Sequence, residues 1–136
     1  KIAADESVRK VSDPLAVALA NAADILVLKA APLGGITNAI RIAKEAGLPV
    51  VVSSALETSV GLSMGAYLAA ELNSPYASGL ATAALLADDV TDHSLTPVDG
   101  EIEVRRILPS VVAIEKLQAD ETTRSTWLGK LNRVLL

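Results

Sequence analysis

The chain has 136 residues, of which 51% are hydrophobic and 21% charged, and its formal net charge is −4. This composition is that of a folded domain with a core, and it excludes a disordered or collagen-like chain. The acidic balance and an aromatic content of only 2% argue against nucleic-acid binding. The lack of cysteine excludes disulfides and thiolate metal sites. Because no apolar run reaches about 18 residues, we expect no membrane partner. The lack of cysteine agrees with a reducing compartment, and we expect a cytoplasmic location.

Short apolar runs that recur at nearly constant intervals predict the strands of the fold. They lie at 1–4, 25–28, 50–52 and 75–78, and each stops at a polar residue or a glycine. Helical patterns fill the intervals: from Pro14 to about Ala22 after a cap at Ser12 or Asp13, from Gly34-Gly35 to Gly47, from Thr58 or Ser59 to about Leu72, and a short stretch at 82–87. This alternation predicts βαβ units and a parallel sheet, with both faces covered because the strands are apolar throughout.

The pattern changes after residue 87. Residues 88–100 are acidic and contain Pro97 and Gly100, which predicts a loop. Apolar residues at 102, 104 and 107 indicate a strand or an extended return segment. Two helices are predicted at 110–118 and 121–136, the second with an apolar face formed by Trp127, Leu128, Leu131 and Val134.

The residues that end the predicted strands are the candidate functional residues. In a parallel α/β sheet, ligands bind at the carboxyl ends of the strands, where Asp5, Lys29, Ser53 and Gly79 all fall. A carboxylate is a good Mg²⁺ ligand, and a lysine at the end of an apolar strand can hold its charge against a developing anion. A plain salt bridge between strand ends is the structural alternative. The turn at 53–58, which includes Ser54, can bind a carboxylate or can simply cap the next helix.

Two further motifs have simpler interpretations. Gly61-Leu62-Ser63-Met64-Gly65 matches the serine hydrolase pattern G-x-S-x-G, with Asp89 and His93 following in the expected order. The hydrolase nucleophile lies on a turn between strand and helix, whereas Ser63 falls inside a predicted helix, so helix packing is the favoured interpretation. The acidic run at 88–92 matches D-D-x-x-D of all-helical isoprenoid synthases, but a solvated loop is favoured in an α/β chain. A non-catalytic α/β binding module stays an alternative to an enzyme.

Four segments resemble the enolase superfamily in their order and spacing. They are Ala4-Asp5-Glu6-Ser7; Val27-Leu28-Lys29 with Gly34-Gly35 following; residues 52–62 beginning Val52-Ser53-Ser54; and Gly79-Leu80-Ala81-Thr82. The likeness is greatest to the actinobacterial branch that forms 2-succinylbenzoate in menaquinone biosynthesis. The resemblance implies the C-terminal part of a (β/α)₇β barrel of the TIM type. Residues 1–100 would supply strands five to eight, and residues 101–136 would pack on the barrel or its capping domain.

The resemblance also implies an activity, a Mg²⁺-dependent lyase that dehydrates a small cyclohexadiene carboxylate by proton abstraction and stabilisation of an enediolate. Asp5 would be a metal ligand, Lys29 would be catalytic by stabilising the anion, and Ser53, Ser54 and Gly79 would bind substrate. The lysine that removes the proton and two other metal ligands would lie in a missing N-terminal half, so we expect residues 1–136 to be inactive alone. N-acylamino acid racemases stay an alternative because they share the paired lysines.

Overall fold

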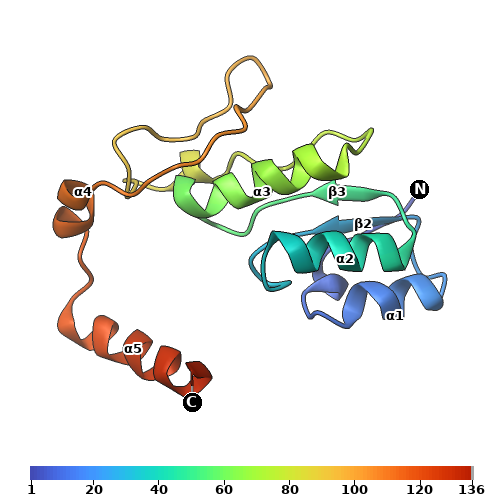
Figure 1. Cartoon of the computed structure of the whole chain (residues 1–136), viewed down its shortest axis with the longest axis horizontal. Helices are drawn as coiled ribbons and strands as arrows, with labels where there is room; N and C mark the ends of the chain where they lie inside the picture. Colours follow the sequence, from blue (N-terminus) through green and yellow to red (C-terminus); the bar gives the residue numbers. More distant parts are fainter. Residues whose placement is uncertain (136) are drawn as a thin grey trace.

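A parallel sheet and the helices that join its strands form the N-terminal part of the molecule, in a computed structural model that describes residues 1–135 (Figure 1). The strands β1 (Ala3–Ala4), β2 (Ile25–Leu28) and β3 (Val50–Val52) lie in the order β1-β2-β3. The 3₁₀ turn η1 (Glu6–Val8) and helix α1 (Asp13–Leu19) follow β1, α2 (Ile36–Ala46) follows β2, and α3 (Ser59–Leu72) follows β3. Helix α2 packs against both α1 and α3, so the three helices form one layer beside the sheet. The predicted βαβ alternation is confirmed.

The core lies between this helical layer and one face of the sheet. Leu26, Leu28 and Val52 from the strands are fully buried with Ile42 of α2 and Leu62 of α3. Of the strand residues of opposite parity, Ala3, Val27 and Val51 are exposed or half-buried, whereas Ile25 is buried. The prediction of two covered faces is therefore wrong for the described residues, because the helices cover only one. The open face is the one that a barrel turns toward its interior.

Backbone conformation sets the ends of the first two helices. Helix α1 begins near Pro14 as predicted but ends at Leu19, short of the predicted Ala22, because the chain turns through Asn21 with a φ of 50°. Helix α2 begins after Gly35 and ends before Gly47, and these two glycines have φ values of 102° and 67°. A positive φ costs glycine little, so both ends match the prediction.

The segment that follows α3 forms less regular structure than predicted. Residues 75–78 do not form a strand; instead Gly79 makes a single parallel bridge to Ser53, in the next position across the sheet. The 3₁₀ turn η2 (Thr82–Leu85) corresponds to the short helical stretch predicted at 82–87. Residues 102–107 are extended but pair with no strand in the described part of the chain.

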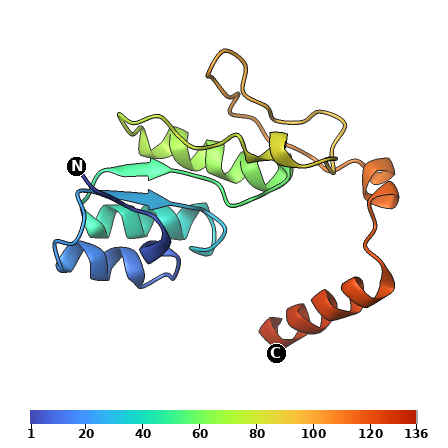
Figure 2. The same ribbon diagram turned by 180° about the vertical axis from the view of Figure 1, so that it is seen from behind.

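Two helices, α4 (Val111–Lys116) and α5 (Glu121–Leu135), form a C-terminal arm, as predicted, although Leu136 lies outside the described residues. In both views α5 lies away from the sheet and its helical layer (Figures 1 and 2). Its predicted apolar face is exposed: Trp127 is 62% exposed and Val134 is 83% exposed. None of the helices within residues 1–135 has the length and apolar character needed to cross a bilayer.

Candidate functional site

The pleat of the sheet brings three of the predicted site residues to its open face. Strand side chains alternate between faces with a period of two. Asp5 shares the parity of Ala3, Lys29 that of Val27, and Ser53 that of Val51, and these three strand residues all lie opposite the helical layer. The register also places each of the three at the carboxyl end of its own strand.

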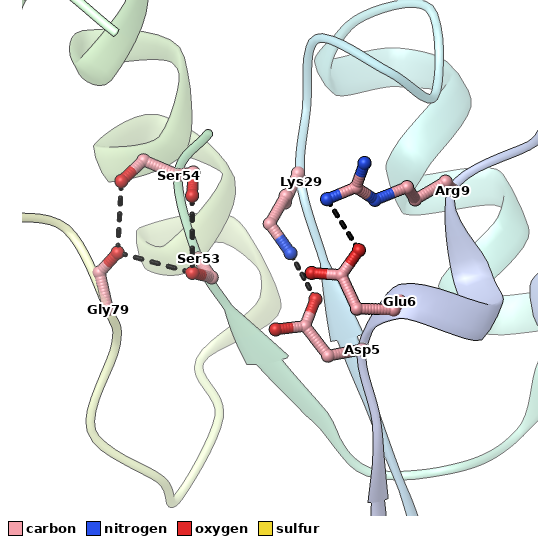
Figure 3. A network of polar contacts seen from close by, with 7 residues as sticks. All are labelled: Asp5, Glu6, Arg9, Lys29, Ser53, Ser54 and Gly79. Atoms are coloured by element: carbon pink, nitrogen blue, oxygen red, sulfur yellow. Dashed lines mark hydrogen bonds and ion pairs between the residues drawn. The ribbon is translucent and has the colours of Figure 1, made fainter. Parts of the chain in front are cut away.

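Asp5 and Lys29 face one another across the ends of β1 and β2 (Figure 3). The Lys29 Nζ forms an ion pair with the Asp5 Oδ1, and the side chain of Lys29 is only 14% exposed whereas that of Asp5 is 46% exposed. Beside them Glu6 pairs with Arg9 at 2.5 Å on a well-exposed surface. Charges that are largely removed from water interact more strongly than exposed ones. The structure therefore brings the predicted carboxylate of Asp5 and the predicted ammonium of Lys29 together, with the ammonium in the less solvated position.

Ser53 and Gly79 occupy the next two positions along this edge, and the sheet already uses their backbone N–H groups. The Ser53 N–H donates to the Leu28 carbonyl at 2.9 Å, and the Gly79 N–H donates to the Val52 carbonyl at 2.8 Å. A Cβ on residue 79 would come within 3.1 Å of the Ser53 hydroxyl, so glycine permits this close approach. The Gly79 carbonyl already accepts the Ser54 N–H at 3.0 Å, so the Ser53 hydroxyl is the polar group of this pair that is best placed to meet a ligand.

Ser54 points elsewhere, into the protein. It is 7% exposed, and its hydroxyl lies 3.1 Å from the Gly79 carbonyl and 2.8 Å from the Thr82 hydroxyl. The structure thus separates Ser54 from the open face on which Asp5, Lys29 and Ser53 lie. Thr82 had no predicted role, and its position three residues after Gly79 is the only hint that the sequence offers.

Asp89 is a second residue whose role the sequence did not reveal. Its carboxylate accepts the backbone N–H of Ser59 at 3.2 Å and the Ser59 hydroxyl at 2.5 Å, so it caps α3 from a distant loop. The Ser59 hydroxyl in turn accepts the N–H of Leu95 at 2.7 Å. Although partial burial acts to raise it, hydrogen bonds from Ser59, Ser94 and Val90 hold the pKa of Asp89 below its ordinary value. The acidic loop is therefore anchored here rather than merely solvated.

The serine hydrolase arrangement does not form. Ser63 lies inside α3, buried, and its hydroxyl donates to the Val60 carbonyl at 2.8 Å. Asp89 is bonded to Ser59, and His93 is exposed on the loop. The glycine that closes the motif, Gly65, instead lets α3 approach Leu80 closely. Packing of small residues, the favoured interpretation of this motif, accounts for all of these contacts.

One oxygen-donor side chain at the open face suits a divalent cation. The carboxylate of Asp5 is half exposed at a strand end, and carboxylates are preferred ligands of Mg²⁺. Within residues 1–135 no three acidic, histidine or cysteine side chains gather to hold a metal. Asp5 therefore fits as one member of a ligand set that needs further donors.

Three curated relatives of the chain share one description. An o-succinylbenzoate synthase from Thermobifida fusca is 53% identical over 131 residues, which make up 96% of this chain and 40% of the relative. The o-succinylbenzoate synthases of Mycolicibacterium smegmatis and Mycobacterium tuberculosis are 46% and 47% identical over the same share of each chain. The chain thus spans about 40% of the length of the curated relatives it matches.

Solved structures and a family model agree on the fold. A muconate lactonizing enzyme from Pseudomonas fluorescens superposes with a TM-score of 0.74 at 23% identity, over 86% of this chain and 34% of that one. A probable mandelate racemase from Alicyclobacillus acidocaldarius superposes with a TM-score of 0.72 at 29% identity, over 86% of this chain and 33% of that one. The model of the family described as "Enolase C-terminal domain-like" matches residues 1–109. The sheet with its polar strand ends, the superpositions and this match together show that the chain belongs to the enolase C-terminal domain-like family of the enolase superfamily.

Proposed function

We propose that the chain is the C-terminal part of an o-succinylbenzoate synthase, a lyase that dehydrates a cyclohexadiene carboxylate to 2-succinylbenzoate in menaquinone biosynthesis. One structural observation carries the proposal, the pairing of Asp5 with a poorly solvated Lys29 at neighbouring strand ends on the open face of the sheet. The identity of 46% to 53% to synthases of that description supports it. An N-terminal half of the same chain would close the barrel over this face.

Lys29 would stabilise the negative charge that develops when the substrate loses the proton next to its carboxylate. Such a proton is weakly acidic, so the anion needs a positive charge that is already in place. At 14% exposure the ammonium of Lys29 is shielded from water, and its field is screened less than that of a surface lysine. The ion pair with Asp5 holds the side chain in position before a substrate arrives.

Asp5 would supply one carboxylate ligand to Mg²⁺, with further carboxylates from the N-terminal half completing the set. When bound, the divalent cation would supply further positive charge to stabilise the anion that forms. The position of Asp5 at the end of β1 suits this role because its side chain is half exposed and turned to the open face. Both oxygens of a carboxylate can act, so an ion pair through Oδ1 does not use up the ligand capacity of the side chain.

Ser53 and Gly79 would meet the succinyl side of the substrate, away from the carbon that loses its proton. The Ser53 hydroxyl lies on the open face and only 3.4 Å from the Gly79 carbonyl, so the two strand ends form one polar patch. Ser54, which we expected to bind substrate with them, is buried. It would instead support the patch through its hydrogen bonds to Gly79.

The C-terminal segment 101–136, which includes the C-terminal arm, would pack on the barrel or its capping domain. Its apolar side chains Trp127, Leu128 and Leu131 are 62%, 47% and 52% exposed. An apolar stripe of this kind is stabilised when a partner surface covers it. In the proposal that partner is the N-terminal half of the same chain.

The test uses the full-length protein and three lysine variants. Replacing Lys29 by alanine removes the charge, and we expect kcat to fall by about 10²- to 10³-fold, the usual cost of losing one electrostatic stabiliser. Lys29→Arg keeps the positive charge but not the geometry of the ammonium, so it should recover little of the lost kcat. Lys44→Ala, which removes an exposed lysine from α2, is the matched control and should leave the rate unchanged.

Formation of 2-succinylbenzoate is followed with and without Mg²⁺, and racemisation of an N-acylamino acid is measured in parallel. A full-length protein that racemises but does not dehydrate would overturn the proposal in favour of the racemase. Dehydration that survives Lys29→Ala would contradict the role of Lys29. Residues 1–136 alone should turn over neither substrate, because the lysine that removes the proton and the other metal ligands would be supplied by the N-terminal half.

A further inference from the structure

We propose that Thr82 is a positioning residue that holds the Ser53–Gly79 patch in place through Ser54. The inference rests on the proposed function, since it assigns to Thr82 a role in binding the substrate of that same site. It differs from a substrate contact, because Thr82 and Ser54 lie behind the patch.

The direction of each hydrogen bond follows from counting hydrogens. The Thr82 hydroxyl donates to the Ala55 carbonyl at 2.8 Å. A hydroxyl has one hydrogen, so in the contact of 2.8 Å between Ser54 and Thr82 the donor is Ser54. The oxygen of Thr82 therefore accepts from one residue of the loop after β3 and donates to the next.

Ser54 is also hydrogen-bonded to Gly79. The Ser54 N–H donates to the Gly79 carbonyl at 3.0 Å, and its hydroxyl lies 3.1 Å from that oxygen. Thr82 lies three residues after Gly79, at the start of η2, and its side chain bonds to the loop that begins at Ser53. Figure 3 shows how Ser53, Ser54 and Gly79 lie in this network. This closed set of bonds fixes the distance between the two strand ends that form the patch.

Removing the Thr82 hydroxyl would take away the donor to the Ala55 carbonyl and one of the two acceptors near the Ser54 hydroxyl. Ser54 is 7% exposed, so water cannot readily replace Thr82 as the acceptor of its hydroxyl. A buried polar group that loses its partner moves or costs stability. Ser54 has the Gly79 carbonyl as its other acceptor, and a shift toward it would carry Ser53 along.

The experiment compares Thr82→Val, Thr82→Ser and Ser54→Ala in the full-length protein with Mg²⁺. Valine has the shape of threonine without the hydroxyl, and we expect KM to rise about tenfold while kcat stays within about threefold, because the patch is remote from the reacting carbon. Thr82→Ser keeps the hydroxyl and should restore KM to within about twofold of wild type. Thr126→Val, which removes an equivalent bond to the Thr122 carbonyl in exposed α5, is the matched control.

Ser54→Ala gives an independent measurement if Thr82→Val does not fold. It should raise KM in the same way, and the double variant Ser54→Ala, Thr82→Val should be no worse than Thr82→Val alone, since both act through one set of bonds. An unchanged KM in a folded Thr82→Val, or a Thr82→Ser as impaired as the valine variant, would overturn the positioning role. A wild-type protein that does not dehydrate the substrate refutes the proposed function instead.

Discussion

Replacing Gly65 by alanine tests how α3 is seated against the segment that carries Gly79. A Cβ at residue 65 would lie 2.7 Å from the Cδ2 of Leu80, closer than van der Waals contact allows. Leu80 is 4% exposed, so its side chain has little room to turn away, and it follows Gly79 directly in the chain.

Two opposing terms set the size of the effect. Alanine is favoured over glycine in a helix interior by up to about 1 kcal/mol. Overpacking a filled core costs about 1 to 3 kcal/mol. We therefore expect Gly65→Ala to lower the free energy of unfolding by about 1 kcal/mol, with the overpacking term the larger.

Urea unfolding followed by far-UV circular dichroism measures this difference. Gly129→Ala is the matched control, because α5 leaves no atom within 4 Å of the new Cβ and no loss of stability is expected. Leu80→Ala removes the group that is struck, so on that background Gly65→Ala should stabilise rather than destabilise. If Gly65→Ala lowers stability equally with and without Leu80, the contact with Leu80 is not the cause and the reasoning is refuted.

Two other predictions concern polar residues of α3 and its cap. Asp89→Asn should lower the free energy of unfolding by about 1 kcal/mol at pH 7, because the carboxylate caps α3. The folded-state pKa of Asp89 is lowered, so its contribution is present above the ordinary value of 3.8 and is lost as the pH falls through the lowered pKa. The gap between wild type and Asp89→Asn in urea titrations should therefore narrow in acid, and a gap that is constant with pH would contradict the assignment. Ser63→Ala should leave the dehydration rate of the full-length protein within about twofold of wild type, since its hydroxyl bonds only within the helix; abolished turnover would restore Ser63 as a nucleophile.

The sequence alone determined the alternation of strands and helices and the place of Asp5 and Lys29 at strand ends. Both depend on local order: apolar runs form strands, glycines at 35 and 47 permit the backbone turns that bound α2, and parallel strands bring their carboxyl ends to one edge. The family resemblance rested on the same residues, and the match over residues 1–109 confirms it.

The tertiary structure alone decided which polar groups meet across long stretches of chain. Thr82 reaches Ser54 over 28 residues and Asp89 reaches Ser59 over 30, and no local pattern marks either partner. It also separated Ser54 from Ser53, adjacent residues that the pleat sends to opposite sides, and it left 75–78 without strand pairing. Strand and helix patterns in a sequence depend on residues that are close together in the chain. These contacts depend instead on how the folded strands, helices and loops pack against one another.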